Sequence, residues 1–501
     1  MVAHYRQPDP DAGERMLARL VHRGPDDSGR VAVGDSWLGH RRLSIVDVAG
    51  GHQPLSTADG ELHLVANGEI YNHGELHDRL GHRRFATASD NEVALHLFDE
   101  EGPDALAELR GMFALCAAGA DGRFVAARDP LGIKPLYWAR RHGQVRFASE
   151  LRAFDADWRG DVDSFPPGHY WTPRSGLVRF AAVQPPPDGG DPPGSPDEVL
   201  ETVRSTVVAA VERRMMGDVP VGVFLSGGLD SSIIAAVAAR HARREGRRLQ
   251  TFAVGLEGST DLPAARMVAA HLDSEHRERV YTADELVDAV TEVVRVVESY
   301  EPSLVRSAVP NYLLAELAAA HVKVVLTGEG ADELFAGYEY LEGVDGAGNL
   351  QRELVRTVEG LHHLNLQRCD RVTMAHGLEA RVPFLDLDVV ALSLGLPARW
   401  KRPGPGKIRK QLLREAFAGW MPDEVLWRGK EQFGDGTGAT AVLGERMADS
   451  VTDAELHAAR DDGNGGLPPP RSREELAYQR TFRRYLAGVR ADRVLGRFPT
   501  H

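Results

Sequence analysis

The segment Val221–Ser232, VGVFLSGGLDSS, combines an apolar run, a Gly-Gly turn, an acidic residue and a pair of serines. An apolar run that ends in such a turn is typical of a buried strand followed by a helix. Backbone N–H groups at a helix N-terminus attract phosphate, and glycine lets the backbone approach it closely. The segment is not a Walker A loop, because no Gly-Lys-Ser/Thr follows. It predicts a nucleotide site in which Asp230 is suited to a magnesium ion at a leaving pyrophosphate.

A second strand-turn segment, VVLTGEGADELFAGY at Val324–Tyr338, carries Glu329, Asp332 and Glu333 directly after its glycine turn. In open parallel sheets, sites form at the carboxyl ends of the strands. We therefore expect the two glycine turns to meet at one edge of one sheet. A single acidic turn is usually a solvated loop, but that explanation is harder to sustain for two turns that both end buried strands.

Strands alternate with helices after residue 196. Apolar strand-like runs occur at Gly222–Leu225, Thr251–Leu256 and Val322–Leu326, and helical periodicity occurs at Ile233–Ala239 and Leu286–Val297. This alternation predicts a parallel, doubly wound α/β sheet.

The first half of the chain has a different pattern, in which short strand-like runs are separated by turn signals such as Asp-Gly and Asn-Gly. The expected strands are Trp37–Leu43, Glu61–Ala66, Gly111–Ala117, Arg123–Ala127 and Gln144–Ala148. Such runs predict an α+β domain rich in antiparallel strands.

A segment dense in proline, glycine and aspartate, QPPPDGGDPPGSP at Gln184–Pro196, separates the two patterns. It can bury little apolar surface and cannot continue a helix, so it is interpreted as a linker. The expected domains are therefore residues 1–183 and 197–501, with residues 184–196 between them. Mobile loops are expected at Pro403–Gly406 and Asp461–Pro470.

Composition narrows the class of protein. The formal net charge of −14 over 501 residues argues against a nucleic-acid or anionic-membrane binder. No apolar run approaches the roughly 18 residues that a membrane span needs, and the first ten residues do not resemble a signal peptide. Two cysteines are too few for a disulfide scaffold or a cysteine zinc site. These features predict a cytoplasmic enzyme.

Taken in order, these segments resemble the class B, glutamine-hydrolysing asparagine synthetases. SGGLDSS resembles their pyrophosphatase loop, Thr251–Leu256 their adenine strand and LTGEGADELFAGY their acidic loop; ARVPFLD at Ala380–Asp386 and WRGKEQFGDG at Trp427–Gly436 also match. The resemblance implies an α+β N-terminal-nucleophile domain of the class II glutamine amidotransferase type. An α/β pyrophosphatase-loop domain of the adenine nucleotide alpha hydrolase type would follow it.

The resemblance implies a ligase that adenylates a carboxylate, most simply the β-carboxylate of aspartate, and displaces AMP with ammonia. ATP is then the co-substrate and Mg²⁺ the metal. By motif, the nucleotide would be held by Leu225, Ser226, Gly227, Gly228, Asp230, Ser231, Ser232, Val254, Thr327 and Gly328. Asp230 and Asp332 would hold the metal. Glu329, Lys430 and Arg306 would be catalytic, Glu329 by taking a proton from ammonia and the two cations by offsetting phosphate charge.

The N-terminal half resembles the glutaminase domain of the same family. The matching segments are His22–Gly29, Arg41–Asp47, Asn67–Asn72 and Ser89–Val93. The implied glutamine-binding residues are Arg42, Leu43, Ser44, Ile45, Val46, Asn67, Gly68, Glu69 and Asp90. Arg42 can clamp the α-carboxylate of glutamine, Glu69 and Asp90 can pair with its α-ammonium, and Asn67 with the Gly68 N–H can form an oxyanion hole.

The nucleophile of that domain does not match. The family begins Met-Cys, whereas this chain begins Met1-Val2-Ala3 and reaches its first cysteine at Cys116, in an apolar run typical of a buried strand. We expect the first strand and its cysteine to be missing. Either the true start lies upstream, or glutaminase activity is lost, as in the similar β-lactam synthetases. The retained glutamine-pocket residues favour the first explanation, and in both cases this chain should hydrolyse glutamine poorly.

The sequence leaves the acceptor carboxylate open, because Ser303-Leu304 stands where similar synthetases often carry Thr-Thr. The alternative function is therefore a specialised ligase that amidates another carboxylate or closes a β-lactam. A non-catalytic paralogue is disfavoured by the intact acidic and basic site residues. The expected partners are aspartate or another carboxylate, glutamine or ammonia, and ATP. The family also implies a homodimer.

Overall fold

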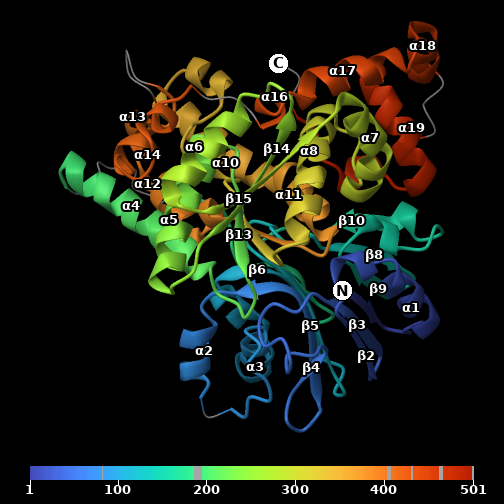
Figure 1. Ribbon diagram of the computed structural model, residues 1–501. Coiled ribbons are helices and arrows are strands. Elements are labelled where there is room, and N and C mark those ends of the chain that lie inside the picture. Colours follow the sequence, from blue (N-terminus) through green and yellow to red (C-terminus); the bar gives the residue numbers. More distant parts are fainter. Residues whose placement is uncertain (82, 185–193, 403–407, 430–432, 462–465, 499–501) are drawn as a thin grey trace.

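The computed structural model describes the chain except for residues 82, 185–193, 403–407, 430–432, 462–465 and 499–501. Most of the expected linker, the Pro403–Gly406 loop and part of the Asp461–Pro470 loop therefore lie outside the described residues. Figure 1 shows the N-terminal half, blue to cyan, beneath the C-terminal half, green to red.

The N-terminal half contains two six-stranded sheets. One has the strand order β10-β8-β9-β1-β3-β2 and the other β12-β11-β7-β6-β5-β4. Their strands are β1 (Val2–Tyr5), β2 (Asp27–Val33), β3 (Ser36–Arg42), β4 (Leu55–Ser56), β5 (Leu62–Ile70), β6 (Gly111–Gly119), β7 (Phe124–Arg128), β8 (Tyr137–Arg141), β9 (Gln144–Ala148), β10 (Val162–Ser164), β11 (His169–Thr172) and β12 (Gly176–Arg179). Neighbouring strands pair antiparallel in both sheets, for example β1 with β3 and β9, and β6 with β5 and β7. The predicted antiparallel-rich α+β domain is confirmed.

Alternation along the strands stacks these sheets face to face. Within β6, Ala114, Cys116 and Ala118 belong to a core cluster shared by both sheets, while Phe113 and Leu115 belong to a second cluster with helix α3 (Glu92–Glu101). Helix α1 (Pro10–Ala18) packs on β1 and β3. Because alternate side chains along a strand face opposite sides of its sheet, each sheet packs on the other sheet with one face and on a helix with the other. The domain therefore has four layers: a helix, two sheets and a second helix. Helix α2 (His73–Arg79) packs on α3.

The C-terminal half is built on a five-stranded sheet, all of whose pairings are parallel. Its order is β15-β14-β13-β16-β17, from β13 (Val221–Phe224), β14 (Gln250–Leu256), β15 (Glu275–Tyr281), β16 (Val324–Leu326) and β17 (Glu379–Arg381). The order reverses between β13 and β16, and the two glycine turns follow these two strands. The predicted doubly wound sheet is confirmed, and its switch point is where ligands bind in such folds.

Helices flank this sheet, with α5 and α6 on one side and α8 and α11 on the other (Figure 1). The longer ones are α4 (Pro196–Arg213), α5 (Leu229–Arg244), α6 (Asp261–Leu272), α7 (Ala283–Val297), α8 (Pro302–Ala319), α10 (Ala347–Gly360), α11 (Asn365–Met374), α12 (Leu387–Gly395), α17 (Ala439–Asp449), α18 (Asp453–Asp461) and α19 (Arg473–Leu486). The short ones are α9 (Ala331–Leu334), α13 (Ala398–Lys401), α14 (Gln411–Ala416), α15 (Asp423–Leu426), α16 (Phe433–Gly436) and α20 (Ala491–Val494). Both predicted helices lie within α5 and α7.

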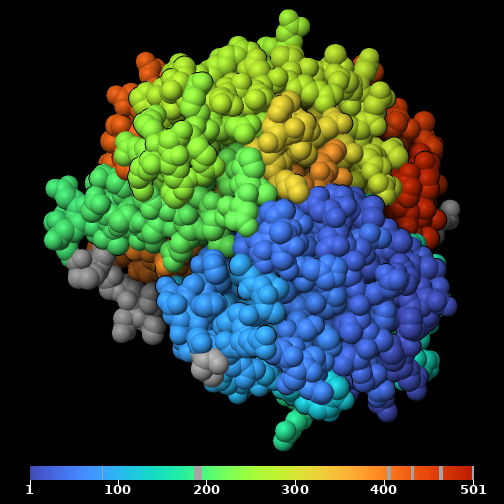
Figure 2. Space-filling model, turned by 60° about the horizontal axis from the view of Figure 1, so that its bottom comes forward, coloured from blue at the N-terminus to red at the C-terminus, as the bar shows by residue number. Residues whose placement is uncertain are grey.

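The two halves are in direct contact, as the blue and the green-to-yellow surfaces of Figure 2 show. Buried ion pairs cross the boundary, including the two-bond pair between Arg23 and Asp370 and the pair between Lys134 and Glu379. Within the described residues, no helix is long and apolar enough to cross a membrane.

Candidate active site

A cavity of about 620 Å³ opens at the carboxyl ends of β13 and β16. The turn after β13 contributes one wall, and the acidic turn after β16 contributes the facing wall. The two turns pack closely, because a Cβ added to Gly328 would lie 2.9 Å from the Cβ of Asp230. The sheet topology thus brings together two segments about a hundred residues apart, as the sequence predicts.

The first wall presents the N-terminus of α5. Its first residue follows Gly228, and no side chain caps the helix, so its leading N–H groups are available to an anion. Ser231 Oγ donates to the Gly228 carbonyl at 3.2 Å, and the Ser226 N–H donates to Ser231 Oγ at 3.3 Å. Gly227 has a φ of +74°, and a Cβ there would lie 2.5 Å from Ala264. The turn is therefore shaped to expose backbone amides.

Eight of the ten expected nucleotide-binding residues line the cavity: Leu225, Ser226, Gly228, Asp230, Ser231, Val254, Thr327 and Gly328. Gly227 and Ser232 are not among the described residues that line it. Gly227 packs against α6, and Ser232 is fully buried behind the turn. These two residues therefore support the shape of the loop.

Lys410 lies between the two expected metal ligands. Its Nζ is 2.5 Å from Asp230 Oδ2 and 2.5 Å from Asp332 Oδ1, and its side chain is 3% exposed. Lys410 has a φ of +58°, a strained conformation for a side-chain-bearing residue. A Cβ at Gly337 would lie 1.9 Å from Asp332 and 2.2 Å from Lys410, so only glycine fits there. Sequence reasoning missed Lys410, which lies in no glycine turn.

A second ion pair sets the environment of Glu329. Arg368 of α11 donates to the Glu329 carboxylate and, at 2.9 Å, to Ser307 Oγ of α8. Arg368 is 9% exposed and lines the cavity together with both partners. Sequence reasoning missed Arg368 too, because arginine within a helix gives no local signal of function.

Glu333 is a protonatable group at the edge of the same cavity. The Tyr338 hydroxyl donates to Glu333 Oε1 at 2.5 Å, and Asn365 Nδ2 donates to the same oxygen at 3.1 Å. Burial, reinforced by the neighbouring Asp332 carboxylate, raises the pKa of Glu333 to about 7.

The expected catalytic cation Arg306 lies away from the cavity. Arg306 is not among the described residues that line the cavity; its Nε lies 3.5 Å from Glu474 Oε1 of α19. Ser303, Ser307 and Asn311 follow one another at intervals of four residues along α8 and form a row that faces the cavity, and Arg306 lies to one side of this row. Lys430 lies outside the described residues.

The Ser303-Leu304 pair changes the cavity less than its sequence indicates. Ser303 lines the cavity and keeps a hydroxyl there. Leu304 is fully buried in the core of the C-terminal half, one helical step away from that face. The apolar replacement therefore lies in the core.

A smaller pocket, of about 50 Å³, lies in the N-terminal half. Eight of the nine expected glutamine-binding residues line it: Arg42, Leu43, Ile45, Val46, Asn67, Gly68, Glu69 and Asp90. Ser44 is not among its described lining residues. The C-terminal half completes the pocket with Met374 and Glu379.

The acidic side chains of this pocket are held in a low-dielectric setting. Burial raises the pKa of Asp90 to about 6, although Asp90 accepts the Ile70 N–H at 2.6 Å. Burial and the neighbouring Asp90 also raise the pKa of Glu69, which lies 3.3 Å from Arg381 Nη2 of β17. Arg42 donates to the carbonyls of Val46 and Asp47, so it also shapes the pocket's rim.

Met1 lies where the pocket meets the sheet. Its α-amino group donates to Ser149 Oγ at 3.0 Å, and burial lowers the pKa of this amine to about 5. The chain then enters β1, so the expectation that the first strand is missing is wrong: Val2–Tyr5 pairs with both β3 and β9. Cys116 is fully buried between the two sheets, as predicted, and no cysteine is among the described residues that line the pocket.

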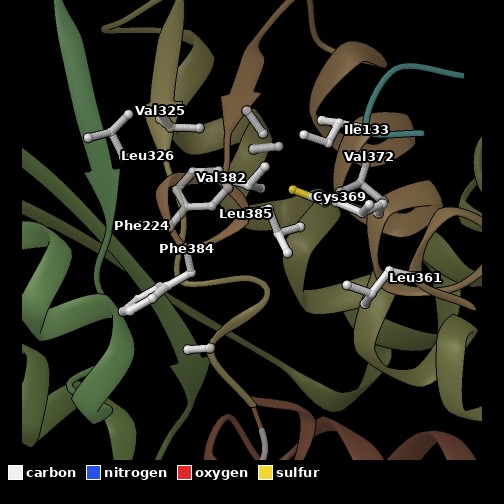
Figure 3. Close-up of a cluster of buried hydrophobic side chains, with 14 of the residues drawn as sticks. Ile133, Phe224, Val325, Leu326, Leu361, Cys369, Val372, Val382, Phe384 and Leu385 are labelled. Carbon is white, nitrogen blue, oxygen red and sulfur yellow. The ribbon is translucent and has the colours of Figure 1, made fainter. Parts of the chain in front are cut away.

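An apolar region lies between the two sites. Ile133 of the N-terminal half belongs to the same core cluster as Cys369 and Val372 of α11, which line the large cavity (Figure 3). Helix α11 therefore reaches both sites: Cys369 and Val372 line the large cavity, and Met374, at its end, lines the small pocket.

The chain matches two family models. Residues 202–345 and 342–494 match the asparagine synthase family, and residues 2–173 match the glutamine amidotransferase domain. Asparagine synthetase [glutamine-hydrolyzing] 3 of Arabidopsis thaliana is 41% identical over 442 residues, which cover 85% of this chain and 76% of the plant protein. Asparagine synthetase B [glutamine-hydrolyzing] of Escherichia coli (strain K12) is 40% identical over 485 residues, covering 93% and 86%. Among solved structures, Bacillus subtilis glutamine phosphoribosylpyrophosphate amidotransferase complexed with ADP and GMP covers 49% of this chain and 64% of its own, at 20% identity and a TM-score of 0.30.

Proposed function

This chain belongs to the glutamine-hydrolysing asparagine synthetase family, and on that premise we propose how its own residues form asparagine from aspartate. It is an ATP-dependent ligase with a class II glutamine amidotransferase domain and an asparagine synthase domain. In the proposed reaction, an oxygen of the aspartate β-carboxylate attacks the α-phosphorus of ATP, and pyrophosphate leaves. Ammonia then attacks the acyl carbon, AMP leaves and the nitrogen loses a proton.

The observation that carries this proposal is the meeting of the two turns across Asp230 and Asp332 at the switch point. The uncapped start of α5, with Ser226 and Ser231, would hold the leaving pyrophosphate through N–H and hydroxyl donors. Leu225 and Val254 would contact the base. In this arrangement the leaving group, which gains the most charge, faces the helix N-terminus.

The residues present fit Mg²⁺. Two carboxylates converge on one cationic atom, and oxygen ligands of this kind are what Mg²⁺ prefers, with phosphate oxygens completing its shell. Asp230 and Asp332 would hold the ion, which would supply neutralising charge for the phosphates. Lys410, released from one or both carboxylates, would then donate to a phosphate oxygen.

Glu329 is the proposed base for ammonia. Arg368 keeps the Glu329 carboxylate oriented, and Ser307 accepts a hydrogen bond from the other side of the guanidinium. Glu333, with its pKa of about 7, would retain a proton in part of the molecules at neutral pH and limit charge repulsion beside Asp332. Arg306 and Lys430 remain proposed phosphate-neutralising cations, and Arg306 would have to leave Glu474 to take that role.

We further propose that glutaminase activity is absent from this polypeptide. Met1 lines the pocket that holds Arg42, Asn67, Glu69 and Asp90, and a methionine thioether cannot form the thioester that a cysteine thiolate forms. The nitrogen donor for this polypeptide would be free ammonia. We also propose a homodimer in the cytoplasm, with domains at residues 1–183 and 197–501 joined by residues 184–196.

The adenylation half-reaction gives the first test. With ATP, Mg²⁺ and labelled pyrophosphate but no nitrogen donor, label should enter ATP only when aspartate is present. Asp332→Asn should reduce this exchange at least tenfold, and the exposed Asp388→Asn should not change it. Label entering ATP with another carboxylic acid but not with aspartate would reject aspartate as the acceptor.

A further inference from the structure

The large cavity has a wall that belongs to none of the sequence motifs. Gly496, Arg497 and Phe498, which follow α20 near the end of the chain, line the cavity with Ser303, Arg368 and Glu329. We refer to Gly496–Phe498 as the tail segment. It reaches the site across more than a hundred residues of intervening chain, so it is placed there by tertiary contacts.

Helix α19 anchors the tail segment from one side. Arg497 Nη2 donates to Glu475 Oε1 at 3.0 Å, and Arg471 Nη1 donates to the Phe498 carbonyl at 3.3 Å. The Glu475 side chain is fully buried and also accepts from Arg471 Nε at 2.9 Å. Because the Glu475 carboxylate is buried, its charge depends on these two arginines, so it holds both of them in place.

The start of α8 anchors it from another side. Arg471 Nη2 donates to Glu301 Oε2 at 2.6 Å, and the Arg497 guanidinium lies 5.6 Å from the centre of the Tyr300 ring. Tyr300 and Glu301 directly precede the turn that carries Ser303. The anchoring residues are two arginines and two glutamates: Arg471, Arg497, Glu301 and Glu475. They add little net charge, so their effect on the cavity is mainly steric.

The third contact is with the segment before α11. A Cβ added to Gly496 would lie 2.7 Å from the Cβ of His363, so the backbone passes directly against His363. His363 itself lines the cavity and lies just before the start of α11, which carries Arg368. The tail segment therefore contacts the residues that directly precede α8 and α11, the two helices that carry Ser307 and Arg368.

We propose that the tail segment is the acceptor-side wall of the synthetase site and sets the size of carboxylate that the site adenylates. The nucleotide side of the cavity is formed by the turn after β13 and by β14, whereas the tail segment adjoins the side that holds the proposed base. Phe498 presents an apolar surface there, which restricts space to a small amino acid and excludes water from the acyl-adenylate. This inference rests on the proposed function, because it assigns a wall of the same site.

Phe498→Ala tests the wall directly, with Arg490→Ala as the matched control. Arg490 is exposed, pairs with Asp492 and precedes the tail segment by only a few residues. For Phe498→Ala we expect the KM for aspartate to rise about tenfold, which corresponds to about 1.4 kcal/mol, while the KM for ATP stays within about twofold. AMP formed per asparagine should exceed one, because water reaches the acyl-adenylate. Arg490→Ala should match the wild type in all three.

A variant that ends at Leu495 lacks the tail segment and provides a second test. Its melting temperature is measured together with its kinetics, to show that the shortened chain is folded. Unchanged aspartate KM and AMP-to-asparagine ratio in Phe498→Ala and in a folded truncation would overturn the assignment. Equal increases in the KM for ATP and for aspartate would also overturn it, because they indicate general damage to the cavity. A wild-type chain without aspartate-dependent activity would instead reject the proposed function, and the acceptor assignment with it.

Discussion

At the scale of single residues, Lys410 decides how the metal ligands behave before nucleotide arrives. Its ammonium stands between Asp230 and Asp332 and offsets the repulsion between two partly buried carboxylates. A divalent ion has to compete with this internal cation. The structure therefore predicts that metal binding is weak without ATP.

Replacing Lys410 by methionine should strengthen Mn²⁺ binding in the nucleotide-free protein by about tenfold or more, because two adjacent carboxylates are left without their shared cation. Electron paramagnetic resonance of free Mn²⁺ measures this without turnover. Lys323→Met, which removes an exposed ion pair with Asp26, is the control. Equal Mn²⁺ affinity in wild type and Lys410→Met would show that Lys410 does not compete for the site.

Lys401 is a buried base whose titration should be visible in stability. Its side chain is 2% exposed, donates to the Ser393 carbonyl at 2.7 Å and to Gln351 at 3.1 Å, and burial lowers its pKa from 10.5 to about 7. Above pH 7 the folded state therefore releases a proton that the unfolded chain keeps until about pH 10.5. Stability should rise with pH over this window, by about 2 kcal/mol between pH 7 and 9.

Thermal melts at pH 7 and pH 9 test this sign. The wild type should gain melting temperature over this interval relative to Lys401→Met, which cannot titrate there. Arg399→Met, at an exposed position of the same helix, should follow the wild type. A parallel pH dependence in wild type and Lys401→Met would contradict burial of a neutral lysine.

Single residues also mark the limit of what the sequence could predict. The glycine turns and their acids were found because local spacing determines their chemistry. Lys410 and Arg368 were missed because their partners lie 180 and 39 residues away, and only the folded topology brings them together. Leu304 gives the opposite case, in which a local sequence signal suggested a change in the site that the structure does not have. Its position around helix α8 places the side chain in the core and away from the cavity.

At the scale of elements, the segment Ala380–Asp386 (ARVPFLD) connects a strand to two helices. Asp386 caps α12 by accepting the Asp388 N–H at 3.0 Å, and it accepts from Arg214 of the C-cap of α4 at 2.6 Å. Arg214 is 3% exposed, so its charge depends on this partner. The motif thus joins β17, α12 and α4.

Asp386→Ala should lower the free energy of unfolding by about 3–5 kcal/mol, because it removes a helix cap and leaves a buried arginine unpaired. Asp388→Ala provides the matched control two residues away: its side chain is 42% exposed and pairs with Arg110 and Arg213, so about 1 kcal/mol or less is expected. Melting temperatures of the two variants should differ clearly. Similar small losses in both would contradict the structural role given to Asp386.

Most elements could be predicted because hydrophobic period and turn residues are local. Gln144–Ala148 coincides with β9, and the other expected strands differ from the observed ones only at their ends, where sheet pairing sets the limit. Strand β1 was not expected, because four residues before a proline-containing turn give too short a pattern. Its pairing with β3 and β9, far away in sequence, stabilises it.

At the scale of the whole molecule, buried charges tie the two halves together. Arg23 bonds Asp370 at 2.7 and 2.9 Å, and fully buried Arg371 of the same helix lies 3.3 Å from Glu150. Separating the halves would expose or orphan these groups, at a cost of several kcal/mol (about 3–5) for each broken pair. The halves should therefore unfold together.

Calorimetry should show one unfolding transition for the wild type. Asp370→Ala removes the two-bond partner of Arg23 and should lower this transition by several degrees or divide it into two. Arg30→Ala, which removes an exposed pair with Glu14, should leave it unchanged. Two separate transitions in the wild type would show that the interface contributes little to cooperativity.

We expect this polypeptide to make asparagine from aspartate and ATP with ammonia as its nitrogen source. The most direct measurement supplies ¹⁵N-ammonium in one reaction and amide-¹⁵N glutamine in another, and follows labelled asparagine by NMR. Labelled asparagine should form from ammonium alone. A Met1→Cys chain, with cysteine exposed at its N-terminus, should additionally use glutamine. Labelled asparagine from glutamine in the unaltered chain would contradict the assignment of the N-terminal pocket, and none from either donor would contradict the synthetase assignment.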